Sequence, residues 1–103
     1  MTQRIITVFR SRLADGIEVD YAVVAKRMSE LAIAMPGYIE HKTFVADDGE
    51  RLTLATFTNR ETHEAWRTHP EHIAAQHAGR DRFYAEYSLT VAEVHHHRDF
   101  RRP

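Results

Sequence analysis

The strand-like segments of this chain carry apolar side chains on both faces, and this feature most restricts its fold. In residues 5–13, Ile5, Phe9 and Leu13 fall on one face, and Ile6 and Val8 on the other. A strand with this pattern is covered on both sides. A chain of 103 residues supports one modest core and not two. We therefore expect a single domain over residues 1–103, with a core at 3–95 and a C-terminal tail at 96–103.

The remaining periodicities predict two further kinds of segment. Apolar residues three and four apart predict an amphipathic helix from Val19 to Met35, which Pro36-Gly37 ends. Alternating strands are expected at 38–45, 51–58 and 84–97, with a polar turn at 46–50 joining the first two. A second helical region lies between the last two of these strands. The order of elements is therefore βαββαβ, which predicts a ferredoxin-like sandwich of the α+β class.

The second helical region has recognisable ends. Thr58 and Glu61 match a capping box, which predicts a helix beginning near Asn59. Proline is tolerated in the first turn of a helix but not in its interior, so Pro70 predicts two short helices that meet at Thr68-His69. Gly79 suits the end of the second.

Helices in this arrangement cover only one face of the sheet. Because both strand faces are apolar here, the other face needs a partner, and a second copy of the chain supplies one. We therefore predict a homodimer.

Charge and cysteine content exclude several classes of function. The 14 basic and 15 acidic side chains are mixed along the chain, which gives no support for electrostatic binding of nucleic acid. The chain has no cysteine, so disulfides, thiolate nucleophiles and cysteine-bound metals are excluded. No apolar run is long enough for a signal peptide or a membrane span, and we expect a cytoplasmic protein without membrane partners.

The segment 65–80 is the most informative for function, because it holds the only tryptophan and three histidines. Trp66 either anchors its helix on the sheet or lines a pocket. His72 would need a metal ligand four residues later, where Gln76 stands, so we expect no metal site. His95, His96 and His97 are expected at the surface. No nucleophile motif or glycine-rich phosphate loop is present.

Aromatic side chains could instead line an apolar pocket for a flat organic molecule, with His72 or His77 as its polar group. In the alternative interpretation most of them are core. They are Tyr38, Phe44, Phe57, Trp66, Phe83, Tyr84 and Tyr87.

The string Trp66-Arg67-x-His69-Pro70-Glu71-His72-x-Ala74-Ala75-Gln76-x-x-Gly79-Arg80, followed by Phe83-Tyr84-x-x-Tyr87, resembles the antibiotic biosynthesis monooxygenase family. The resemblance covers nearly the whole chain and implies a ferredoxin-like domain that dimerises through its sheets into a dimeric α/β barrel. The family includes cofactor-independent oxygenases of polyphenols or quinols, haem-degrading enzymes and proteins without known activity.

The resemblance implies roles for particular residues. Trp66 matches a tryptophan that positions substrate, and His72 falls where a polar pocket residue is expected. For haem degradation, His77 or His72 would be the axial ligand, but the family's asparagine is missing from the first strand.

The leading hypothesis is therefore an oxidoreductase, a cofactor-independent monooxygenase of a small aromatic, polyketide or quinol-like substrate. Its catalytic residues would be Trp66 and His72, and its substrate-binding residues His77, Phe57, Tyr84 and Tyr87. The alternatives are a haem-degrading monooxygenase and a non-catalytic dimeric module that binds a small ligand.

Overall fold

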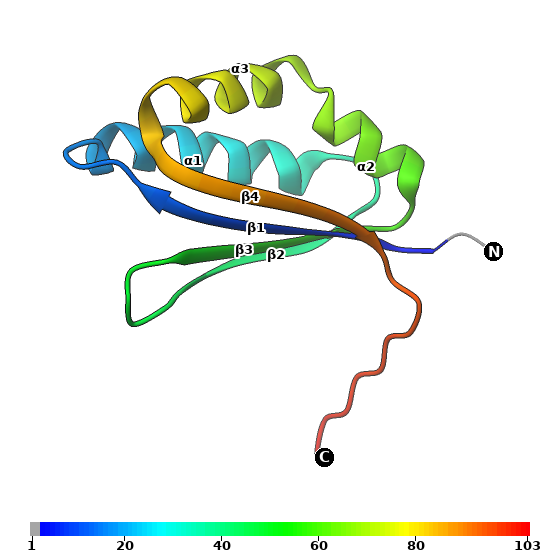
Figure 1. The fold of residues 1–103 in the computed structure, drawn as a ribbon. Helices are drawn as coiled ribbons and strands as arrows, with labels where there is room; N and C mark the ends of the chain where they lie inside the picture. Colours follow the sequence, from blue (N-terminus) through cyan, green and yellow to red (C-terminus); the bar gives the residue numbers. More distant parts are fainter. Residues whose placement is uncertain (1–2) are drawn as a thin grey trace.

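Four antiparallel strands form one sheet, and the helices lie on one of its faces (Figure 1). The computed structural model describes residues 3–103, so residues 1 and 2 of the expected domain lie outside it. The strand order is β2-β3-β1-β4. The elements are β1 (Ile5–Leu13), α1 (Glu18–Ala34), β2 (Tyr38–Val45), β3 (Arg51–Phe57), α2 (Arg60–Arg67), α3 (Pro70–Ala78) and β4 (Tyr84–Glu93). The predicted α+β, ferredoxin-like arrangement is confirmed.

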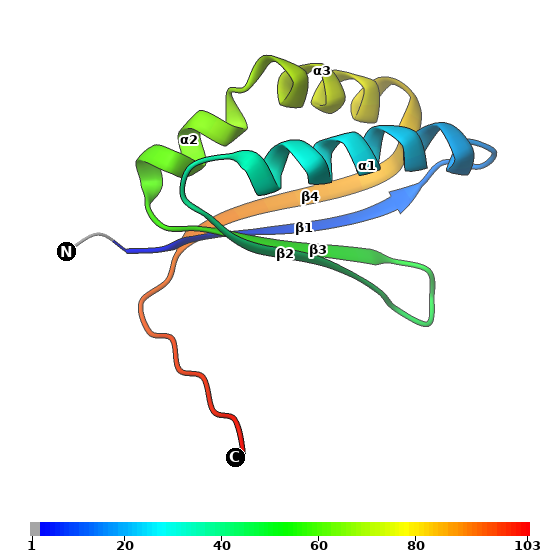
Figure 2. The same cartoon turned by 180° about the vertical axis from the view of Figure 1, so that it is seen from behind.

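The register of the strands divides their side chains between two faces. Ile5 pairs with Phe57 on β3 and with Glu93 on β4, and these positions face the helices. We call this the helix-side face. The next positions, Ile6 and Val8, face away from the helices, and Val8 pairs with Leu54. We call this second face the bare face, because no helix covers it in either view (Figures 1 and 2).

The core lies between the helices α1 and α2 and the C-terminal end of strand β3. Phe57 is 1% exposed, and it packs with Ala32 of α1 and Trp66 of α2. Met28, Leu31 and Met35 recur at helical spacing along α1 and close this cluster. The amphipathic pattern of residues 19–35 therefore predicted the helix that buries the core.

The helix junction follows the sequence prediction with one correction. α2 ends at Arg67 and α3 begins at Pro70, as the proline predicted. The cap of α2, however, is Asn59 and not Thr58. The backbone of Asn59 is extended, and its side-chain oxygen accepts a hydrogen bond of 2.8 Å from the Thr62 N–H.

The C-terminal ends of the last helix and of the last strand also differ from the prediction. Gly79 follows α3, but with φ −59 it continues into a single π-helical turn over Gly79–Phe83. β4 ends at Glu93 and does not continue to residue 97. Glu93 pairs with Ile5, the first residue of β1, and beyond this pair one further backbone hydrogen bond of 2.8 Å joins the Val94 N–H to the Arg4 carbonyl.

Residues 94–103 form neither helix nor strand and extend from β4 on the side of the bare face (Figures 1 and 2). His95, His96 and His97 lie there and are exposed. Within residues 3–103 no helix combines the length and apolar character that a bilayer span requires.

Candidate active site

Trp66, in the last turn of α2, is buried against the sheet. His63 and Trp66 are one helical turn apart, so both point at the sheet, and they are 6% and 8% exposed. The Trp66 indole stacks on the Phe57 ring, with centroids 6.4 Å apart and planes inclined by 20°. The indole therefore has a fixed position above β3.

His72 covers the Trp66 indole. The two ring centroids are 4.2 Å apart, and the planes are inclined by only 18°. The break between the helices produces this contact: His69 caps α3 by accepting a hydrogen bond of 3.1 Å from the Glu71 N–H on its Nδ1, and His72 follows in the first turn. The Gln76 amide nitrogen lies 3.4 Å from His72 Nδ1. The predicted catalytic residues are thus one stacked pair.

Burial makes His72 a neutral imidazole near pH 7. Desolvation lowers the pKa of His72 below 6.5, and the backbone of Arg67 and Trp66 opposes this shift only in part. A neutral imidazole has one nitrogen lone pair that can accept a proton. The stacked pair therefore has the chemical character of a general base held in a fixed plane.

His63 is a second buried histidine, which sequence reasoning left without a role. Its Nε2 lies 3.0 Å from the Thr7 hydroxyl of β1, and its ring meets Phe57 edge-on at 6.0 Å. Burial lowers its pKa as well. The signal that could have identified it is its spacing of three residues before Trp66, which places both on the same face of α2.

The four predicted substrate-binding residues lie in different places. Phe57 lies beneath Trp66 and is almost fully buried. Tyr84 and Tyr87 lie at the other end of the sheet, where their rings contact Phe9 at 5.3 and 5.5 Å. His77 is exposed on α3. The structure thus joins Phe57 to Trp66 and His72, and separates both tyrosines from them.

An exposed apolar row on β4 was not singled out as a site from the sequence. Tyr87, Leu89 and Val91 are 43%, 51% and 46% exposed, although they lie on the helix-side face. Val91 pairs with Thr7, whose hydroxyl contacts His63. The row therefore runs from the tyrosines toward the residues that support Trp66.

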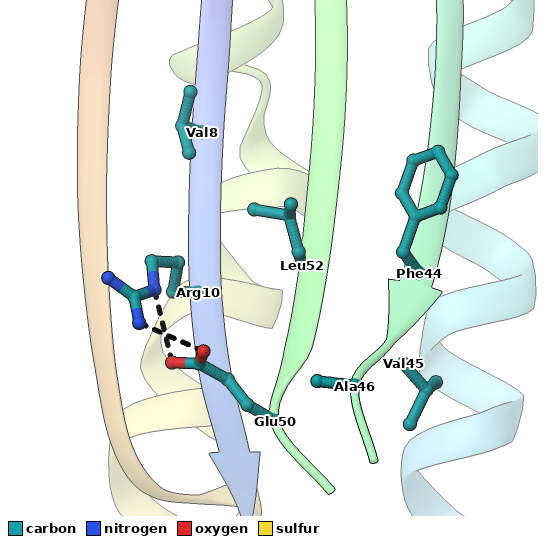
Figure 3. A pocket seen from close by; sticks show the side chains of 7 residues that line it. All are labelled: Val8, Arg10, Phe44, Val45, Ala46, Glu50 and Leu52. Atoms are coloured by element: carbon teal, nitrogen blue, oxygen red, sulfur yellow. Dashed lines mark hydrogen bonds and ion pairs between the residues drawn. The ribbon is translucent and has the colours of Figure 1, made fainter. Parts of the chain in front are cut away.

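A pocket of about 440 Å³ lies on the bare face, at the hairpin end of the sheet (Figure 3). Arg10 and Glu50 form an ion pair of 2.9 Å at its edge. Its lining residues are Val8, Arg10, Phe44, Val45, Ala46, Glu50 and Leu52. The sheet separates this pocket from Trp66 and His72, so the two cannot act on one ligand.

No group of three or more histidine, cysteine or acidic side chains with metal-binding geometry occurs in residues 3–103. His97 reaches only Asp99, at 3.0 Å in the exposed tail. The two buried histidines contact other groups: His72 stacks on the Trp66 indole, and His63 contacts the Thr7 hydroxyl.

Comparison with known proteins gives one relative in sequence and several in fold. The chain is 33% identical over 81 residues to the uncharacterized protein YqjZ of Bacillus subtilis, covering 79% of this chain and 71% of the relative. No protein-family model matches the sequence.

Among solved structures, a variant of SnoaB, a cofactor-independent oxygenase from Streptomyces nogalater, superposes with a TM-score of 0.78. It covers 92% of this chain and 96% of that chain at 14% identity. A candidate antibiotic biosynthesis monooxygenase from Nitrosomonas europaea has a TM-score of 0.76, covering 92% and 93% of the two chains at 9% identity. The chain therefore belongs to the family of Bacillus subtilis YqjZ and has the fold of the antibiotic biosynthesis monooxygenases.

Proposed function

We propose that this protein is a cofactor-independent monooxygenase that oxidises a small aromatic, polyketide-like or quinol-like molecule with dioxygen. The observation that carries the proposal is the stacking of His72 on Trp66 at 4.2 Å, in an environment that keeps the imidazole neutral. The SnoaB structure supports it, because that protein of the same fold is a cofactor-independent oxygenase.

The reaction needs a base and dioxygen but no external reductant. For an anthrone, His72 removes one proton from the ring methylene and leaves an enolate, which is far more electron-rich than the neutral ketone. Its carbon forms a bond to dioxygen and gives a peroxide. His72 returns its proton to the peroxide, and the O–O bond then breaks as the second methylene hydrogen leaves as a proton, which gives a quinone and one water. Both atoms of dioxygen and all four electrons are accounted for.

The apolar row on β4 is the surface on which we place the substrate. Its exposed side chains offer a flat organic molecule an apolar support on the helix side of the sheet. Trp66 orients the His72 ring and borders the substrate. Tyr87 extends the row away from His72, and the Tyr84 ring lies 5.7 Å from the Tyr87 ring. We assign these two tyrosines, and the exposed His77 of α3, a role in binding rather than in proton transfer.

The working unit we propose is a homodimer formed through the bare face. This face presents Val8, Leu52 and Leu54 on neighbouring strands, and Phe44 beside them is 46% exposed. A second sheet placed here would bury these side chains and fill the pocket at the hairpin end. The helix-side face stays open to substrate in this arrangement.

Oxygen uptake on an anthrone tests the proposal. Protein dialysed against EDTA should consume dioxygen with anthrone, His72→Gln should lose at least tenfold in kcat, and Trp66→Phe should lose less. His96→Gln is the matched control, an exposed histidine in the tail beyond β4 that takes no part in the proposed site. If neither anthrone nor a hydroquinone gives oxygen uptake above the buffer rate, the proposal is wrong and the non-catalytic ligand-binding module is favoured. A Soret shift on addition of haemin would favour the haem-degrading alternative.

A further inference from the structure

Arg51, at the start of β3, is a partly buried cation that no carboxylate neutralises among residues 3–103. Its Nε is buried and has no hydrogen-bond partner in the part of the chain that the structure describes. Six other arginines each form an ion pair: Arg10, Arg12, Arg27, Arg60, Arg67 and Arg82. A buried N–H without an acceptor is unfavourable, so an arginine left in this state calls for an explanation.

A row of tyrosines begins at the Arg51 guanidinium on the helix-side face. The guanidinium carbon lies 5.4 Å from the centre of the Tyr21 ring, which belongs to the first turn of α1. Tyr21 meets Tyr84 edge-on at 5.9 Å, and Tyr84 meets Tyr87 at 5.7 Å. Arg51, Tyr21, Tyr84 and Tyr87 together are called the arginine–tyrosine cluster.

The hydroxyl of Tyr84 stays protonated in this cluster, beside the Tyr21 hydroxyl. Burial, followed by the neighbouring Tyr21, raises the pKa of Tyr84 far above its usual value, so the phenol keeps its proton at every physiological pH. Ser11, which pairs with Arg51 across the sheet and is 3% exposed, lies beneath the cluster. The cluster thus combines one guanidinium fork with three phenol hydroxyls and three aromatic rings.

These groups select a particular ligand chemistry. A guanidinium binds a carboxylate through two parallel N–H···O bonds, and aromatic walls favour a flat ring on the same molecule. One uncompensated positive charge matches a ligand with one negative charge better than a phosphate with two. We propose that the arginine–tyrosine cluster binds a small aromatic carboxylate, with Arg51 holding the carboxylate and the tyrosines contacting the ring.

This site is distinct from the stacked pair of Trp66 and His72. Arg51 lies six residues from Phe57 along β3, which is about 20 Å in a strand. A ligand with one or two fused rings cannot reach both places. The cluster shares Tyr84 and Tyr87 with the far end of the proposed substrate surface, but Arg51 takes no part in the oxygenation, so variants of Arg51 test the anion site separately.

Calorimetric titration with 2-naphthoate and with its neutral analogue 2-naphthamide tests the proposal. Naphthoate should bind the wild-type protein at least tenfold more tightly than the amide. Arg51→Met should remove that preference, Arg51→Lys should retain part of it, and Tyr84→Phe should weaken it. Arg98→Met removes one positive charge from the exposed tail and should change neither affinity.

The Arg51 Nε–H resonance gives a structural readout, assigned by its loss in Arg51→Lys. Naphthoate should move its proton signal downfield as the group gains an acceptor, and the amide should not. Equal binding of the two probes, naphthoate affinity unchanged in Arg51→Met, or no binding by folded wild-type protein at millimolar probe would each overturn the proposal.

Discussion

Replacing Gly37 by alanine should destabilise the protein more than the same change at either of two other glycines. Gly16, Gly37 and Gly49 all have positive φ, of 78°, 81° and 89°. An alanine in this region is strained by about 1 kcal/mol. A Cβ at Gly16 or Gly49 would meet nothing within 4 Å, whereas at Gly37 it would overlap the Thr62 side chain.

The overlap at Gly37 affects the helix that carries Trp66. Thr62 belongs to the first turn of α2, and its N–H donates the capping bond to Asn59. Because the neighbouring turn cannot move without disturbing this cap, we add about 1–3 kcal/mol for overpacking. Gly37→Ala should therefore lower the free energy of unfolding by about 2–4 kcal/mol, against about 1 kcal/mol for Gly16→Ala or Gly49→Ala.

Urea denaturation followed by the fluorescence of Trp66, the single tryptophan, measures all three variants in one way. Protein concentration must be equal in each experiment, so that association does not enter the comparison. A loss at Gly37 no greater than that at Gly49 would show that the turn after α1 does not pack on α2 as described.

Three further outcomes follow from the structure. Burial lowers the pKa of His63 and His72 below 6.5, so between 6.5 and the folded-state pKa the unfolded chain binds more protons than the folded chain. The free energy of unfolding should therefore fall from pH 7 toward pH 5, by up to about 1.4 kcal/mol per pH unit for each histidine. In urea titrations, His63→Gln should make the free energy of unfolding depend less on pH. Thr7→Val removes the partner of His63 Nε2 and should cost about 1–2 kcal/mol of stability by the same assay, an unchanged midpoint being the contrary result. Leu54→Glu places a charge on the bare face and should convert a dimer to a monomer in sedimentation analysis, whereas an unchanged sedimentation coefficient would remove this face as the interface.

Strong local signals made most of the fold predictable. The apolar pattern of residues 19–35 favours a helix, and Pro70 favours a helix start. Tertiary contacts override neither of these local preferences. The end of β4 could not be read in this way, because the alternation continues to residue 97. It is the start of β1 at Ile5 that ends the pairing at Glu93. Likewise Thr58 and Asn59 are both acceptable caps, and only the extended backbone at Asn59 selects one.

The candidate site was predictable in its members but not in its geometry. Trp66 and His72 stand out because they flank a proline, yet their stacking depends on the angle at which α3 leaves the break. Tyr84 and Tyr87 lie at the other end of the sheet from this pair. The number of residues between them in the sequence does not show this distance. Arg51 was missed because a sequence does not show which of its arginines lack carboxylates.

The most direct measurement compares the pH dependence of anthrone oxidation with the NMR titration of His72 in the same protein. If His72 is the base, kcat/KM should rise with pH through a value below 6.5 and then level off. That value should agree with the pKa of the His72 ring, and both features should vanish in His72→Gln. A rate independent of pH between 5 and 7.5, or a His72 pKa above 6.5, would contradict the assignment of His72 as the neutral base of a cofactor-independent oxygenase.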